Sequence, residues 1–333
     1  MIPEIVPQIP AWQRELACAI SDPAELLRIL DLDPALLPAA KAAAGLFPLR
    51  VPRGYVARMH KGDPDDPLLR QVLPVAAETS VTPGFSTDPV GDHKAMVAPG
   101  VLHKYRGRVL LITTGACAIH CRYCFRREFP YAEANPRAAD WRQAFNYLVS
   151  DASIDEVILS GGDPLSLTNQ GLAALLEKLT AIPHLRRLRI HSRLPIVLPE
   201  RVDQGLLAWL ASSRLQPVMV LQANHPREIS PPVGRVIRGL GAVGVVLLNQ
   251  AVLLKGVNDS AKVLAELGDS MFRIGVIPYY LHLLDRVRGT AHFEVEEGQA
   301  VRIMEEMRAS LPGYLVPRLV REQAGQPAKV LVS

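Results

Sequence analysis

Three cysteines, Cys117, Cys121 and Cys124, are spaced C-x3-C-x2-C along the chain. Cysteine thiolates are the usual ligands of iron–sulfur clusters, and clusters that only transfer electrons normally use four of them. Three thiolates on a four-iron cluster leave one iron open, and an open coordination position separates a reactive metal site from a closed structural one. The spacing therefore predicts a reactive [4Fe–4S] centre. Two alternatives stay open at this point: a structural zinc site with His120 as fourth ligand, and unrelated free cysteines.

The cysteines follow a strand-like run in a part of the chain where strand and helix patterns alternate. The expected strands are 109–113, 156–159, 188–191, 218–221, 245–248 and 274–280, and the expected helices are 136–148, 171–182, 204–211, 235–240, 261–267 and 297–311. Asn135 as N-cap and Pro136 at the first helical position mark the start of the first helix. Such alternation is typical of βαβ units with a parallel sheet. We therefore expect an α/β fold with a six-stranded partial (β/α)6 barrel of TIM type, and a doubly wound sheet is the rival.

The segments before this alternation have a different character. Residues 12–48 read as short helices, and residues 62–103 carry many turn-forming pairs such as Asp63-Pro64 and Pro83-Gly84. We therefore divide the chain into an N-terminal helical and wrapping segment (1–103), a partial barrel (104–312) and a C-terminal segment (313–333).

Composition limits the function classes. The chain has 333 residues, 49% hydrophobic and 21% charged, which is enough for a large core, and its net charge of +4 forms no basic tract. We therefore expect no nucleic-acid partner, and we assign the densest basic group (Arg122, Arg126 and Arg127) to small anionic ligands. The N-terminus lacks a signal-peptide pattern and no apolar run is long enough to span a bilayer, so we expect a cytoplasmic protein without membrane contact. Cys18 is expected to be a small core residue.

The cysteine spacing resembles the signature of the radical S-adenosylmethionine enzymes. In that superfamily the amino and carboxylate groups of S-adenosylmethionine chelate the open iron, and an electron from the cluster generates a 5′-deoxyadenosyl radical. The resemblance implies that Tyr123 packs near the adenine. It also implies that Ser160-Gly161-Gly162-Asp163 is the glycine-rich loop for this cofactor, with Asp163 on the methionyl ammonium, although such a loop could also be an ordinary βα turn. Gln250 is a further candidate for this cofactor.

Four more segments narrow the resemblance to the lysine 2,3-aminomutases, from about residue 80 onward. They are His103-Lys-Tyr-Arg-Gly-Arg, Cys121-Arg-Tyr-Cys-Phe-Arg-Arg, Leu254-Lys-Gly-Val-Asn-Asp and Gln326-Pro-Ala-Lys. This family implies a second cofactor, pyridoxal phosphate, on a lysine that matches Lys329. A buried lysine has a lowered pKa and is nucleophilic enough to form an imine. The matching cations and hydroxyl on the cofactor side are Lys104, Tyr105, Arg108 and Arg193, and Arg193 could instead be a surface charge at a strand end.

The family also implies a substrate site with a charge at each end. Arg126 matches the residue that takes the α-carboxylate, and Asp285 and Glu322 match the acids that hold the distal ammonium. Asp285 could instead pair with Arg286 or Arg288 at the surface. Lysine is favoured over glutamate, because glutamate would need a cation where these acids stand.

The short C-terminus, Pro83-Gly-Phe-Ser-Thr-Asp-Pro and Tyr280-Leu-His-Leu-Leu-Asp are similar to the branch that makes (R)-β-lysine for the modification of elongation factor P. This branch implies a functional link to elongation factor P and its lysyl ligase, an electron donor such as flavodoxin or ferredoxin, and a homo-oligomer. The alternatives are a free-standing lysine or glutamate 2,3-aminomutase and a non-enzymatic cluster- or zinc-binding protein.

Overall fold

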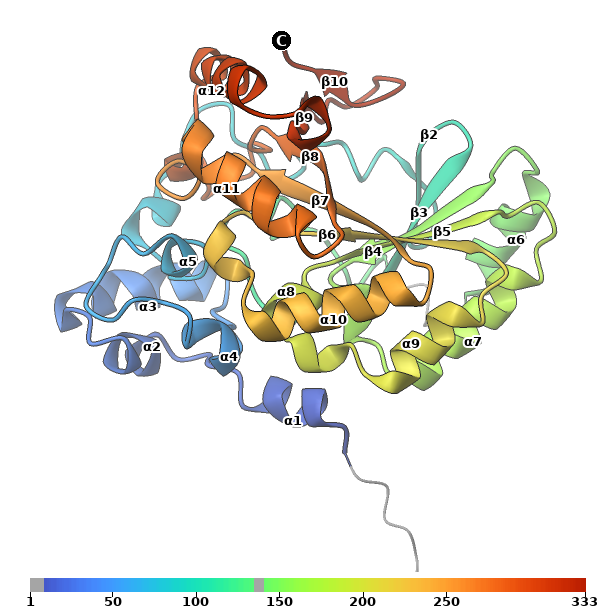
Figure 1. Ribbon diagram of the computed structural model, residues 1–333, viewed down its shortest axis with the longest axis horizontal. Coiled ribbons are helices and arrows are strands. Elements are labelled where there is room, and N and C mark those ends of the chain that lie inside the picture. The colour runs from blue at the N-terminus through green and yellow to red at the C-terminus, as the bar shows by residue number, and fades with distance from the viewer. Residues whose placement is uncertain (1–8, 135–140) are drawn as a thin grey trace, which may run out of the picture.

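A single sheet of ten strands, arranged in sequence order, organises the computed structural model, which describes residues 9–134 and 141–333 (Figure 1). The strands are β1 (Met96–Ala98), β2 (Val101–Tyr105), β3 (Arg108–Thr114), β4 (Glu156–Gly161), β5 (Arg187–Ser192), β6 (Gln216–Leu221), β7 (Val246–Val252), β8 (Ile277–His282), β9 (Arg318–Arg321) and β10 (Val330–Leu331). Neighbouring strands from β3 to β9 pair in parallel. Strands β1, β2 and β10 add antiparallel pairs at the two edges.

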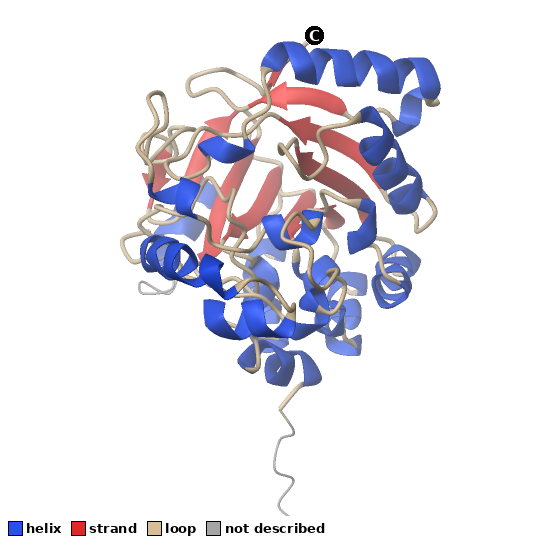
Figure 2. Cartoon of the chain, turned by 90° about the vertical axis from the view of Figure 1, so that its left-hand side faces the viewer, coloured by secondary structure: helices blue, strands red, loops and turns tan. Residues whose placement is uncertain are grey.

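The α/β class and the parallel sheet are therefore as predicted, but the strand count is different. The six predicted strands correspond to β3–β8, and β9 is a seventh parallel strand that continues the sheet beyond β8. Within the described ranges no pairing joins β1 to β10, so the sheet stays open, and Figure 2 shows its strands following one another around a curve.

Long helices follow the strands and cover one face of the sheet. They are α6 (Arg142–Ser150), α7 (Asn169–Thr180), α9 (Gln204–Ala211), α10 (Pro231–Ala242), α11 (Ala261–Phe272) and α12 (Glu297–Ser310). The predicted N-cap Asn135 and the helix start at Pro136 lie outside the described residues. Alternate strand residues, such as Leu188 and Ile190 in β5, join the main apolar core with these helices. The residues between them face the inner side of the curved sheet.

The N-terminal part forms short helices, as predicted, and shares the core of the sheet. These helices are α1 (Ala11–Ala17), α2 (Pro23–Ile29), α3 (Leu37–Leu46), α4 (Arg53–Val56) and α5 (Pro67–Arg70). Trp12, Leu26 and Leu69 are buried in the same cluster as Leu159 of β4. The predicted division at residue 103 falls inside β2, and the three-segment division stays a prediction. None of the described helices is both long and apolar enough to cross a membrane.

Cys18 is not in this core. It caps the C-terminal end of α1, and its side chain is exposed. The prediction of a core cysteine was wrong because the helix is short, so its last turn reaches the surface.

Candidate active site

The three clustered cysteines lie in the loop that follows β3. Cys117, Cys121 and Cys124 are all partly buried free thiols. Backbone hydrogen bonds fold the loop into tight turns, with the Cys124 N–H donating to the Cys121 carbonyl at 3.0 Å. Parallel strands end at this mouth of the sheet, so the loop stands where α/β barrels carry their reactive groups.

The donor set fits an iron–sulfur cluster better than a single zinc ion. Burial, then the neighbouring thiol of Cys121, raises the pKa of Cys124 to about 11, and burial also raises the pKa of Cys117. The Cys117 and Cys124 thiols therefore need a strongly positive group before they ionise. Four sulfurs around one zinc ion lie roughly 3.8 Å apart at the usual bond length. Within the described part of the chain, the three sulfurs do not all lie within 4.8 Å of one another.

His120, the alternative zinc ligand, has its contacts in the N-terminal part of the chain. Its Nδ1 lies 2.8 Å from the Pro48 carbonyl oxygen, and its ring stacks on Phe47 with centroids 5.1 Å apart. These contacts occupy the side chain in a structural role.

Gly161 and Gly162, at the end of β4, let that strand approach the cysteine loop. A Cβ on Gly162 would lie 2.4 Å from the Ala116 carbonyl oxygen, and a Cβ on Gly161 would lie 2.8 Å from the Thr114 carbonyl oxygen. The Gly162 N–H donates to the Thr114 carbonyl oxygen at 2.7 Å, and the Asp163 N–H donates to the Ala116 carbonyl oxygen at 2.8 Å. The glycines are therefore required by backbone packing next to Cys117, a reason that applies before any ligand binds.

The Asp163 carboxylate is buried and holds the following loop. It accepts hydrogen bonds from the Ser192 hydroxyl and from the backbone N–H groups of Leu165, Arg193 and Leu194, at 2.8–3.1 Å. With four internal donors, Asp163 fixes the end of β5 beside the cysteine loop. Its expected contact with an ammonium group stays a prediction.

Arg193 connects the cysteine loop to a buried polar network. Its Nη1 donates to the Cys121 sulfur and to the Tyr123 hydroxyl, both at 2.7 Å, and its Nη2 pairs with Glu228 at 3.0 Å. Tyr123 is buried, and its ring packs edge-on against Phe293 with centroids 6.2 Å apart. Arg193 is therefore next to the cysteine loop, and among the described residues none of its contacts is a partner of Lys104, Tyr105 or Arg108.

A second network of charges lies on the inner side of the sheet. Arg126 Nε pairs with Asp92 at 2.7 Å, and its Nη1 donates to the Ser160 hydroxyl at 3.2 Å. The other oxygen of Asp92 pairs with Lys104 Nζ at 2.7 Å. Although burial alone would raise the pKa of Asp92, these two cations hold it below its usual range.

The same network continues to Lys329. Lys104 Nζ lies 3.6 Å from Glu322 Oε1, and Lys329 Nζ pairs with Glu322 Oε2 at 2.5 Å. The Tyr105 hydroxyl donates to Glu322 at 2.6 Å, and the Arg108 guanidinium lies over the Tyr105 ring, 4.6 Å from its centroid. Burial alone would raise the pKa of Glu322, but Lys329 and these donors lower it. The structure thus brings three of the predicted residues, Lys104, Tyr105 and Lys329, to the carboxylate of a fourth, Glu322.

Asp285 completes the acidic side of this network. Burial raises its pKa to about 7, with Glu322 raising it further and Lys329 lowering it. The surface alternative does not hold, because Arg286 pairs with Glu294 at 2.6 Å and Arg288 with Glu128 at 3.7 Å. Gln250 lies in β7, in register with Tyr280 of β8, and is partly buried.

Comparison with known proteins identifies the family. A family model described as a 4Fe-4S single cluster domain matches residues 106–185. The chain is 50% identical to the L-lysine 2,3-aminomutase of Escherichia coli (strain K12) over 319 residues, which cover 96% of this chain and 93% of that protein. It is 46% identical to the enzyme of the same name from Haemophilus influenzae, with 98% of each chain covered. The chain belongs to the lysine 2,3-aminomutase family.

Membership of the lysine 2,3-aminomutase family makes the protein an isomerase and implies three cofactors: a [4Fe–4S] cluster, S-adenosylmethionine and pyridoxal phosphate. The L-lysine 2,3-aminomutase of Clostridium subterminale is 35% identical over 84% of this chain and 67% of that protein. A radical SAM methyltransferase from Sphaerobacter thermophilus is a distant structural neighbour, with a TM-score of 0.41 and 17% identity over 66% of this chain and 68% of that chain.

Sequence reasoning missed two buried acids of this aminomutase-family chain. Asp92 joins Arg126 to Lys104, and Glu78 pairs with Arg122 at 2.5 Å and with Arg127 at 2.9 Å. The expectation that all three arginines of the basic group serve anionic ligands was therefore wrong for Arg122 and Arg127, which both pair with Glu78. Both acids lie in the turn-rich segment, where an acidic residue is normally an exposed part of a turn. The sequence therefore does not indicate that they are buried.

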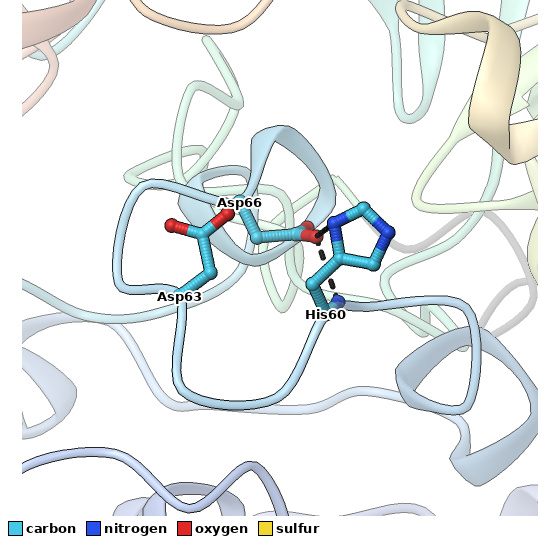
Figure 3. A group of neighbouring side chains, drawn as sticks. All are labelled: His60, Asp63 and Asp66. Carbon is cyan, nitrogen blue, oxygen red and sulfur yellow. Dashed lines mark hydrogen bonds and ion pairs between the residues drawn. The ribbon is translucent and has the colours of Figure 1, made fainter.

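Outside the cysteine loop, one group has the geometry of a metal site. In the described ranges, His60, Asp63 and Asp66 are the only three potential ligands whose ligating atoms all lie within 4.8 Å of one another (Figure 3). Asp66 is already used by the protein, since it accepts from the backbone N–H groups of His60, Leu68 and Leu69 and pairs with Arg227 at 2.8 Å. We therefore interpret this group as the N-terminal cap of α5 and not as a metal site.

Proposed function

We propose that this protein converts L-α-lysine into (R)-β-lysine by moving the amino group from C2 to C3. Cys117, Cys121 and Cys124 hold the cluster in this proposal, and Lys329 holds pyridoxal phosphate. The observation that carries it is the line of alternating charges on the inner side of the sheet, from Arg126 through Asp92, Lys104 and Glu322 to Lys329. In such a line a cation can bind the carboxylate at one end of a small substrate, and an acid can bind the ammonium at its other end.

Arg126 is suited to the substrate carboxylate. Its guanidinium is planar and offers parallel donors that match two carboxylate oxygens. Ser160 and Asp92 hold it in place, and Phe125 lies under it, with the guanidinium carbon 4.7 Å from the ring centroid. A cation fixed in this way loses little freedom when the carboxylate binds.

Glu322 and Asp285 are suited to the substrate ammonium. In the structure the Lys329 ammonium is the cation that balances Glu322. When the Lys329 nitrogen is engaged by the cofactor, the two acids lose that charge, and leaving a buried acid unpaired is costly. The distal ammonium of lysine replaces the missing cation. Glutamate brings a third negative charge to the same place, so the acids favour lysine.

The remaining predicted residues surround the cofactors in this proposal. Lys104, Tyr105 and Arg108 provide donors for the phosphate. On the S-adenosylmethionine side are Tyr123, Ser160, Gly161, Gly162, Asp163 and Gln250. We place Arg193 on this side too, and not with the pyridoxal phosphate cations as the sequence indicated, because it contacts Cys121 and Tyr123. When bound, the cluster and S-adenosylmethionine supply the radical that takes a hydrogen atom from C3, and pyridoxal phosphate supplies the π-system that stabilises the migrating nitrogen. The chain itself orients the groups and excludes water, since Arg126, Ser160 and Asp163 are buried.

We further propose that the product serves the modification of elongation factor P. The support is the similarity of residues 83–89 and 280–285 to the branch of the family with that role. In this proposal a flavodoxin or ferredoxin supplies the electron, and a separate lysyl ligase attaches (R)-β-lysine to elongation factor P.

Anaerobic incubation of the reconstituted protein with lysine, S-adenosylmethionine and a reductant tests the activity. Chiral chromatography should identify (R)-β-lysine, and the Cys124→Ala protein should form none. Formation of β-glutamate from glutamate instead, or of no β-amino acid at all, would overturn the assignment. A second reaction adds elongation factor P and its ligase, and intact-mass analysis should show β-lysine attached in preference to α-lysine.

A further inference from the structure

Two histidines face the inner side of the sheet near Lys329. In β5, Leu188 and Ile190 pack into the main core, so His191 lies on the inner face with Arg189. In β8, Leu281 packs into the same core, so Tyr280 and His282 lie on the inner face. The Tyr280 ring connects this face to the proposed cofactor lysine, because its centroid lies 5.9 Å from Lys329 Nζ and 5.7 Å from the His282 ring.

Both imidazoles carry a buried nitrogen without a partner. Throughout the described residues, the Nε2 atoms of His191 and His282 have no hydrogen-bond partner, and His282 is only 4% exposed. Buried polar atoms in folded proteins are almost always hydrogen-bonded. Two orphan nitrogens on the same polar face therefore indicate that a ligand supplies the missing partners.

Burial first, and the nearby charges second, disfavour the charged form of both rings. Burial, followed by the charges of Arg189, Lys329 and Arg126, lowers the pKa of His191 well below its usual range. Burial, followed by Lys329 and His191, does the same for the pKa of His282. A neutral imidazole offers one donor and one acceptor rather than a charge.

Charge matching then decides which ligand atoms the histidines contact. In the proposed site, the charged groups of cofactor and substrate already have charged partners: the phosphate has Lys104 and Arg108, the carboxylate has Arg126, and the ammonium has Asp285 and Glu322. The polar atoms of pyridoxal phosphate that remain without a partner are its ring nitrogen and its phenolic oxygen. Hydrogen bonds to these atoms tune the electronic properties of this cofactor.

We propose that His191 and His282 are positioning residues for pyridoxal phosphate, which bind the polar atoms of its ring through their free Nε2 atoms. This inference rests on the proposed function, because it needs the cofactor on Lys329. It adds two neutral contacts to a site otherwise built from charged residues.

Cofactor binding measured without turnover tests this proposal. The full-length, cluster-loaded protein is titrated with pyridoxal phosphate in the absence of lysine and S-adenosylmethionine, and the dissociation constant and the absorption maximum of the bound cofactor are recorded. The variants are His282→Phe, His191→Phe, His282→Gln and His191→Gln. Glutamine places an amide nitrogen near the position of Nε2, whereas phenylalanine keeps the ring shape without nitrogen. His184→Gln is the matched control, because its Nε2 contacts the Leu148 carbonyl oxygen away from the inner face.

Each phenylalanine variant should bind the cofactor roughly tenfold or more weakly, the usual effect of one lost buried hydrogen bond, and should shift the absorption maximum. The glutamine variants should recover part of both effects, and His184→Gln should match the wild type. Wild-type affinity and spectrum in both phenylalanine variants would overturn the inference and leave the proposed function intact. A wild-type protein that binds no pyridoxal phosphate would overturn both.

Discussion

Two charge networks lie near the cysteine loop, and they differ in how completely their members are paired. Arg122, Arg127 and Glu78 form a closed network whose side chains are at most 4% exposed. Lys104, Glu322 and Lys329 form an open network whose side chains are 11–23% exposed.

The closed network is anchored on every side by the protein. Arg122 also donates to the carbonyl oxygen of Phe47 at 2.7 Å and stacks over the Phe47 ring, so it ties the cysteine loop to the N-terminal helices. The open network, by contrast, contains Lys329, whose loss of charge would leave Glu322 and the neighbouring Asp285 to be satisfied. We infer that the closed charge pairs hold the loop, whereas the open ones are available to exchange partners with ligands.

The largest expected effect concerns the cysteines that the closed network positions. Replacing Cys117, Cys121 or Cys124 by alanine should abolish cluster loading and activity, because each thiolate holds one iron. Iron and sulfide content after anaerobic reconstitution measures the effect. The exposed Cys18→Ala variant is the control and should load normally. Full loading of any of the three variants would show that the cluster is held elsewhere.

Breaking the closed network should destabilise the fold. The Glu78→Gln variant leaves Arg122 and Arg127 buried without an acid, and removing one partner of a buried ion pair costs about 3–5 kcal/mol. Denaturant unfolding measures the free energy. Glu25→Gln, which breaks the exposed pair with Arg53, should cost less than about 1 kcal/mol. Equal effects of the two changes would mean that the buried network does not hold the loop.

Breaking the open network should affect the substrate instead. Asp285→Asn and Glu322→Gln should each reduce kcat/KM for lysine, since each leaves the ammonium with one acid fewer. The reduction should correspond to a loss of about 1–3 kcal/mol in transition-state binding. The free energy of unfolding should change little, because the open network is partly hydrated. Steady-state assays with lysine and with glutamate give the comparison, and wild-type lysine kinetics in both variants would make the two acids structural.

The pH dependence should be smaller and should distinguish the two acids. Asp285 has a pKa of about 7, so it is increasingly protonated as the pH falls below 7 and can no longer pair with the ammonium. KM for lysine should therefore rise by up to about tenfold per pH unit on the acid side of this value. The pKa of Glu322 is lowered, so the step should vanish in Asp285→Asn. It should persist in Glu322→Gln but move to lower pH, because Glu322 then no longer raises the pKa of Asp285. A step that survives in Asp285→Asn belongs to another group.

The fold was largely predictable because the parallel strands carry either an apolar run, as in β4 and β6, or an alternation of apolar and polar residues, as in β5. All six expected strands overlap β3–β8. Strand β9, Arg318–Arg321, was missed because it has only two apolar residues between two charged ones. This segment is a strand because it pairs with β8, and that pairing cannot be recognised from the local sequence.

Spacing and resemblance were the sequence signals for the candidate site. Cysteine spacing singled out the loop after β3, and resemblance singled out Lys329 and Glu322, which the structure pairs. Asp92, Glu78 and the orphan nitrogens of His191 and His282 could not be found in this way, because burial and pairing are set by tertiary contacts.

The most direct test of the central claim is the location of the cofactor. Borohydride treatment of the protein loaded with pyridoxal phosphate fixes the cofactor on the lysine that carries it, and peptide mass mapping identifies that residue. The account predicts the pyridoxyl group on Lys329, and the Lys329→Ala protein should retain none. The pyridoxyl group on Lys104 or Lys255, or on no lysine at all, would contradict the account.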